Sequence, residues 1–166
     1  PRERSGGASG MLGMARLLGQ TVGAAFVAVL VVVGRTPDLF GEQLAQAIVN
    51  AAASRTNLSV GEAFVRGILC NILVCIAVWM SFAAKRVSGK LLTSYWPVML
   101  FVLCGFEHSI ADMYFGVCGL LTAQVYGIAA ESLTWFNFLV KALLPITLGN
   151  IVGGAGIVGC GYWLAY

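Results

Sequence analysis

The stretch between residues 91 and 130 constrains the fold most, because it is apolar over far more residues than one membrane-spanning helix needs. About 20 helical residues cross a hydrocarbon core of about 30 Å. Three ionisable side chains, Glu107, His108 and Asp112, interrupt the stretch near its middle. A charge at bilayer depth costs roughly 2.5–3.5 kcal/mol on insertion scales, so such residues face protein or a water-filled path. We therefore predict two half-helices separated by a break, followed by a loop around Glu131.

Composition places the whole chain in a membrane. Of its 166 residues, 59% are hydrophobic and 10% are charged, and the mean hydropathy is +0.88. Soluble domains carry about 25% charged residues. The 21 glycines favour helices that pack closely in lipid. The net charge of +3 is small and scattered, which argues against a nucleic-acid partner. We predict an all-α integral membrane protein whose environment is the lipid bilayer.

The apolar pattern divides the chain into four predicted spans. They cover about residues 17–34, 67–84, 91–130 (broken) and 143–166. Residues 1–15 form a stub, and residues 16–166 form one membrane domain. A helix-compatible segment at 41–53 lies within the polar stretch between the first two spans.

Basic residues suggest the orientation. Arg2, Arg4 and Arg16 precede the first span, and a cluster at residues 85–90 separates the second span from the third. Both regions fall on the same side, which the positive-inside rule makes cytoplasmic. Arg35, Arg55, Arg66 and Lys141 then lie on the outer side. The expected location is a plasma membrane or a bacterial inner membrane.

An internal repeat indicates inverted symmetry. The sequence LGQTVGAA at residues 18–25 parallels LGNIVGGA at residues 148–155, in spans that cross the membrane in opposite directions. Such repeats are typical of transporters. The second copy contains three spans and the first shows only its last. On this reasoning two further helices, roughly 60–80 residues, precede residue 1. A chance match between glycine-rich helices is the alternative.

The cysteines offer no sign of a metal site, a cofactor or an enzyme. All five lie in apolar runs without a CxxC pair, and we expect them to be small buried hydrophobic residues: Cys70, Cys75, Cys104, Cys118 and Cys160. One histidine cannot supply bis-histidine haem ligation. We expect neither a metal, nor a cofactor, nor catalytic residues.

Three motifs resemble the formate/nitrite transporter family over essentially all of the chain beyond residue 15. The sequence GILCNILVCIAVWM at residues 67–80 resembles the family's fourth helix. GFEHSIA at 105–111 resembles its broken fifth helix. LGNIVGG at 148–154, with GYW at 161–163, resembles its sixth. The chain then corresponds to helices three to six of six.

This resemblance implies an aquaporin-like bundle, usually a homopentamer with one pore per subunit, that lacks here its first two helices. Such proteins pass small monovalent anions or their acids, such as formate and nitrite. By motif, His108 is the central pore histidine, Asn71 and Asn150 line the route, and Phe101 matches an aromatic constriction. Arg55 stands where the family usually has a lysine at the outer vestibule. Asp112 stands where the family typically has asparagine, which adds a negative charge near the histidine.

His108 fits anion passage chemically. Stripping water from an anion is costly, and an imidazole with an unperturbed pKa of about 6.5 offers either a cation or a proton. The alternative for His108 is a core histidine bonded to a backbone carbonyl. For the whole protein, the alternatives are a neutral-solute pore of the water or glycerol type and a non-conducting membrane subunit.

The other candidates also have two interpretations. Asn71 and Asn150 either bind the substrate or His108, or join helices. Glu107 is expected to be structural, accepting from backbone N–H groups freed by the break. Arg55 either concentrates anions at the pore mouth or is a solvated loop charge. Asp112 either pairs with a neighbouring subunit or sits at a pore-facing end of the half-helix. Phe101 faces either the pore or else lipid or the core.

Overall fold

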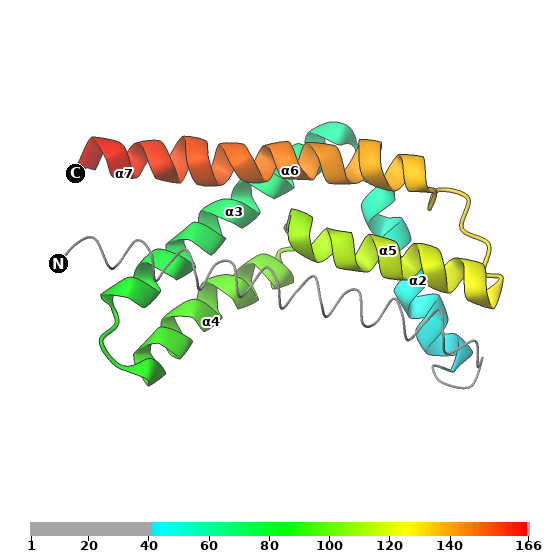
Figure 1. The fold of residues 1–166 in the computed structure, drawn as a ribbon, viewed down its shortest axis with the longest axis horizontal. Helices are drawn as coiled ribbons and strands as arrows, with labels where there is room; N and C mark the ends of the chain where they lie inside the picture. Colours follow the sequence, from blue (N-terminus) through cyan, green and yellow to red (C-terminus); the bar gives the residue numbers. More distant parts are fainter. Residues whose placement is uncertain (1–40, 166) are drawn as a thin grey trace.

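The computed structural model describes residues 41–165, which are helical throughout apart from short connections (Figure 1). The helices in chain order are α2 (Glu42–Thr56), α3 (Val60–Ala83), α4 (Val87–Leu103), α5 (Ser109–Tyr126) and one continuous helix made of η1 (Asn137–Leu143), α6 (Leu144–Ile151), η2 (Val152–Gly159) and α7 (Cys160–Ala165). The segments η1 and η2 are π-helical. The predicted span at 17–34, the stub at 1–15 and the first copy of the repeat lie outside the described residues.

The predicted break in the third apolar unit is confirmed. Helix α4 ends at Leu103, the chain leaves helical geometry, and α5 begins at Ser109. Gly105 adopts a φ of 65°, a left-handed conformation that favours glycine because no Cβ is present. Glu107 and His108 lie in the break, and Asp112 lies in the first turn of α5. Residues 127–134 form the expected loop around Glu131 before the next helix.

Helix α3 begins earlier than predicted, at Val60 rather than at residue 67. Ser59 caps it by accepting a hydrogen bond from the backbone N–H of Glu62 at 3.2 Å. Glu62 and Arg66 then pair one turn apart at 2.5 Å on an exposed face. These polar residues lie within the helix, so a boundary drawn from hydropathy alone is wrong. Likewise α2 runs three residues past its predicted end.

Within residues 41–165, two helices are long and apolar enough to cross a membrane. They are Val60–Ala83, with 24 residues and a mean hydropathy of 2.1, and Asn137–Ala165, with 29 residues and a mean hydropathy of 1.7. The second begins before residue 143, where the last span was predicted to start. Helix α4 is shorter but also apolar. The basic segment at 85–90 is only partly a loop, because α4 begins at Val87.

Helix α3 is the centre of the packing. It contacts α6 and η2 on one side and α4 on another, whereas α2 packs against α5 (Figure 1). The contact between α3 and the last helix is made through glycines. A Cβ on Gly67 would lie 2.6 Å from the carbonyl oxygen of Ile146, and one on Gly149 or Gly153 would collide with the α3 backbone. Small residues of this kind let membrane helices approach closely.

Candidate functional site

In the break between α4 and α5, Arg66 of α3 donates to the carbonyl oxygen of Gly105 at 3.2 Å. Asn150 of α6, which is 6% exposed, makes four further hydrogen bonds around the break. Its amide nitrogen donates to the carbonyl oxygens of Gly67 and Glu107, both at 3.1 Å. Its amide oxygen accepts from the backbone N–H and the hydroxyl of Ser109, both at 3.4 Å. Asn150 therefore joins α3, the break and the start of α5 through one amide group.

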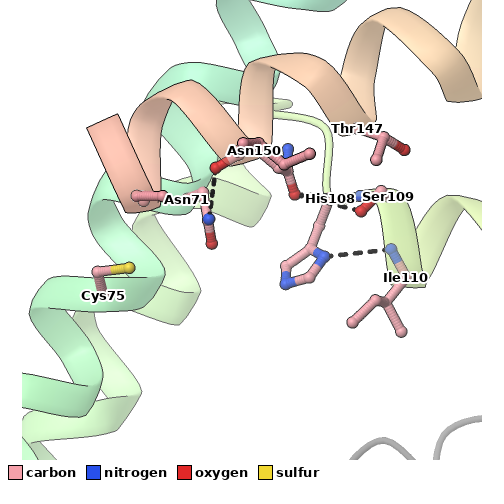
Figure 2. A pocket seen from close by; sticks show the side chains of 10 residues that line it. Asn71, Cys75, His108, Ser109, Ile110, Thr147 and Asn150 are labelled. Carbon is pink, nitrogen blue, oxygen red and sulfur yellow. Dashed lines mark hydrogen bonds between the residues drawn. The ribbon is translucent and has the colours of Figure 1, made fainter. Parts of the chain in front are cut away.

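His108 is the N-cap residue of α5. Its Nδ1 accepts a hydrogen bond from the backbone N–H of Ile110 at 3.3 Å (Figure 2). An imidazole that accepts at Nδ1 is neutral and carries its proton on Nε2. The ring centroid lies 6.2 Å from that of Phe101, with the two rings tilted by 51°. The imidazole thus sits at the start of a helix, where partial positive charge accumulates.

A cavity of about 410 Å³ lies against the histidine. Its walls come from α3, the start of α5, α6 and η2, and its polar lining comprises Asn71, Cys75, His108, Ser109, Thr147 and Asn150 (Figure 2). The structure therefore brings together three of the five residues predicted for the substrate pathway, His108, Asn71 and Asn150. Phe101 neighbours the histidine ring without lining the cavity, and Arg55 does not line it either.

The sequence patterns do not single out Cys75, Ser109 or Thr147. Helix geometry nevertheless contains the signal. Cys75 is one turn from Asn71 on α3, and Thr147 is one turn from Asn150 on α6, so each shares a face with a predicted residue. Ser109 directly follows His108. Extending the candidate asparagines by one helical turn would have found two of these three.

Asn71 joins two helices, which is one of its two interpretations. Its amide nitrogen donates to the backbone carbonyl of Asn150 at 2.6 Å, which joins α3 to α6. The same residue lines the cavity. The absence of a side chain at Gly154 makes room for it, because a Cβ there would collide with the Asn71 amide. Its role toward a substrate stays a prediction.

Arg55, Glu107 and Asp112 form a charged cluster on the other side of the break. The Nε of Arg55 donates to Oδ1 of Asp112 at 2.8 Å and lies 3.4 Å from Oε2 of Glu107. Its guanidinium group also donates to the carbonyl of Ala51 and lies 4.2 Å above the ring centroid of Phe115. The exposed fractions of the three charged side chains are 21%, 10% and 3% for Arg55, Glu107 and Asp112.

This cluster corrects two interpretations and bears on a third. Arg55 is not a solvated loop charge, because it lies in the last turn of α2 and pairs with two acids. Within the described residues, the freed N–H groups of Ser109 and Ile110 are bonded to Asn150 and His108, and the carboxylate of Glu107 pairs with Arg55 instead of capping them. Asp112 pairs within its own chain, since its Oδ1 accepts from Arg55.

The cysteines are free thiols in this structure, as expected. Their predicted burial is wrong for Cys104 and Cys160, which are exposed at the surface of the described part of the chain. Between residues 41 and 165, no three potential metal-ligating side chains come together.

Comparison with known proteins identifies the family. The model of the family described as "Formate/nitrite transporter" matches residues 7–164. The chain belongs to the formate/nitrite transporter family. It is therefore an integral membrane protein of a transporter and channel family.

Individual members of the formate/nitrite transporter family give the same result. The chain is 39% identical over 153 residues to "Formate channel FocA" of Haemophilus influenzae, a match that covers 86% of this chain and 54% of the relative. It is 42% identical over 110 residues to "Probable formate transporter" of Methanothermobacter thermautotrophicus, covering 66% of this chain and 37% of the relative. The chain thus spans about half, or less, of the length of these curated relatives.

Solved structures also match. One described as "Pentameric formate channel with formate bound" superposes with a TM-score of 0.74 at 34% identity, covering 87% of this chain and 61% of that chain. A second, described as "FNT family ion channel", gives a TM-score of 0.72 at 31% identity and covers 87% of this chain and 55% of that chain. The formate/nitrite transporter fold is therefore present in the arrangement of these helices.

If water reaches the cavity in this formate/nitrite transporter, Cys75 will react with a charged, membrane-impermeant thiol reagent. Cys75 lines the cavity, whereas Cys70, on the same helix, is 0% exposed. In variants that keep only one of these two cysteines, labelling of Cys75 should be at least about tenfold faster, because reactivity requires access. Mass spectrometry after timed labelling measures both rates. Equal rates would contradict a water-accessible cavity.

Proposed function

We propose that the protein carries small monovalent anions such as formate or nitrite, or their conjugate acids, across the membrane. The observation that carries this proposal is the position of His108 at the N-terminus of a half-helix, facing a cavity in a membrane protein of this family. Transporters commonly point helix N-termini at anionic substrates. The names of the relatives as formate channels and transporters support the choice of substrate.

The imidazole addresses the main energetic problem of the route. A bare anion that enters an apolar constriction loses its water, which is unfavourable unless a donor or a positive charge replaces it. With Nδ1 accepting from the N–H of Ile110, the N–H of the ring is at Nε2, and this is the donor that acts on a substrate. In this neutral form the ring hydrogen-bonds the anion. To transfer a proton, the ring must first take up a second proton at Nδ1, giving up the hydrogen bond from Ile110; the imidazolium then passes one proton to the anion's oxygen, the neutral acid crosses, and the ring returns to its neutral form.

Asn150 acts in this proposal as a positioning residue. Its amide donates twice and accepts twice within the protein, so it holds the backbone on both sides of His108. Asn71 offers its amide oxygen at the cavity wall. Phe101, next to the imidazole, is the proposed aromatic constriction. Arg55 is proposed to favour anions near the route by offsetting the charge of Glu107 and Asp112, acting from behind the break rather than in the cavity lining.

We further propose a homopentamer with one conduit per subunit, supported by the match to a structure described as a pentameric formate channel. The cluster at residues 85–90 and the N-terminal stub are placed on the cytoplasmic side by the positive-inside rule. The membrane is a plasma membrane or a bacterial inner membrane. Transport needs no cofactor and no catalytic residue.

Uptake of labelled formate and nitrite into proteoliposomes over a range of external pH tests the function. The unaltered protein should move both solutes in a pH-dependent manner. His108→Asn removes the titratable group and should lower flux by at least about tenfold, or about 1.4 kcal/mol of barrier, and abolish the pH dependence.

Thr147→Val is the matched control, because Thr147 lines the same cavity while its hydroxyl donates to Leu143 of its own helix at 2.7 Å. It should retain the pH profile. Unchanged pH dependence in His108→Asn would make the histidine merely structural. Passage of water or glycerol without formate or nitrite would indicate a neutral-solute pore, and no flux of any solute would indicate a non-conducting subunit.

A further inference from the structure

Two acids and one base are enclosed together behind the cavity. Arg55 pairs with Asp112 at 2.8 Å and lies 3.4 Å from Glu107. The Asp112 side chain is 3% exposed and that of Glu107 is 10% exposed. If all three groups were ionised, the cluster would hold one uncompensated negative charge in a largely enclosed site. A buried charge without a partner is strongly unfavourable.

The two carboxyl groups also have too few hydrogen-bond donors around them. Oδ2 of Asp112 is buried and accepts no hydrogen bond from any described residue. Arg55 directs its Nε to Oδ1 and another of its N–H groups to the carbonyl of Ala51. The carboxyl groups of Glu107 and Asp112 both lie at the same nitrogen, Nε of Arg55, at 3.4 and 2.8 Å. Two carboxylates that share one site cannot both ionise easily, and a proton bound by one of them relieves the repulsion.

Among the described residues, the other cation near the break is Arg66 of α3, which donates to the carbonyl oxygen of Gly105 and pairs with Glu62 rather than with either acid of the cluster. From α3, the Cys70 thiol lies close enough to interact electrostatically with both acids. In the break, His108 accepts at Nδ1 and is therefore neutral. Asn150 of α6 donates to the backbone carbonyl of Glu107 rather than to its carboxyl group. Lys141 of η1 is exposed.

We propose that Glu107 and Asp112 form a proton-binding site that shares one proton between the two carboxyl groups, with Arg55 balancing the remaining charge. The site binds its proton whether or not the protein transports anions, and its relevance to the route rests on the proposed function. Protonated, the cluster is neutral and leaves the potential at His108 favourable to an anion. Loss of the proton places a negative charge behind the histidine and opposes anion entry.

Infrared spectroscopy of the purified protein at neutral pH tests the site. A shared proton predicts the C=O stretching band of a protonated carboxylic acid, which shifts on exchange into D₂O. Asp112→Asn and Glu107→Gln each leave one acid paired with Arg55, so each should remove one protonated carboxyl group per chain from the difference spectrum. The two variants test the site separately, so a folding failure in one leaves the other informative.

Glu62→Gln is the matched control, because Glu62 also pairs with an arginine, at 2.5 Å, but its side chain is 45% exposed. Its difference spectrum should show loss of an ionised carboxylate. The same ionised signature from Asp112→Asn or Glu107→Gln would overturn the proposal. The spectrum needs no flux, so a missing band with normal formate uptake refutes only this site, whereas a band without uptake refutes only the proposed function.

Discussion

Replacing Asn150 with leucine is expected to lower the free energy of unfolding by roughly 3 kcal/mol, because each buried polar group left unpaired costs about 1–3 kcal/mol. Leucine has a similar volume but removes the donors to Gly67 and Glu107 and the acceptor for Ser109. Formate flux should fall along with stability, because the backbone on both sides of His108 loses its support. Thermal unfolding in detergent and flux in proteoliposomes measure the two effects.

Thr147→Val is again a suitable control, because Thr147 lies one turn away on α6 and bonds only within its own helix among the contacts described. It should change the unfolding midpoint far less than Asn150→Leu does. If both variants lose the same small amount of stability, Asn150 does not hold the break, and its position in the cavity serves another purpose.

Gly153→Ala is expected to destabilise the protein by about 2 kcal/mol, within the range for overpacked cores. A Cβ on Gly153 would collide with the carbonyl group of Ile68, and α3 and η2 would have to separate. Since the obstacle is backbone, a change of side-chain rotamer cannot relieve it. Thermal unfolding measures the effect.

The control variant, Gly161→Ala, is expected to leave stability unchanged or to increase it. Gly161 lies on the same continuous helix, in α7, and a Cβ there meets no atom of the described chain within 4 Å. Alanine is a better helix former than glycine by about 1 kcal/mol, so Gly161→Ala should be neutral or stabilising. A loss of equal size in both variants would show that the close approach at Gly153 is not what limits stability.

The break was predictable because hydropathy and charge conflict there. Residues 91–130 are too long for one span, and Glu107, His108 and Asp112 mark the point where a straight helix would bury charge in lipid. The start of α3 was not predictable from hydropathy, since Ser59 and Glu62 are polar residues. They do match the pattern of a helix cap, which is a local signal of a different kind.

The candidate site was likewise predictable from the sequence only in part. The motifs mark His108, Asn71 and Asn150 individually, and the structure shows that they line one cavity. The partner of Arg55 has no local signature, because Asp112 lies 57 residues further along the chain and the pair forms only when α2 packs against α5. Long-range contacts of this type follow from tertiary packing, which periodicity does not encode.

The π-helical turns of η2 have a consequence for the far end of the last helix. Each π-type hydrogen bond encloses one residue more than an α-helical bond does. The side chains of α7 therefore point in a different direction around the helix axis than they would in a uniform α-helix. In this orientation Tyr162 meets Trp79 of α3 edge to face, with ring centroids 5.8 Å apart. The π-helical turns thus rotate the later part of this continuous helix, so that its glycines face α3 in one segment and Tyr162 faces α3 further along.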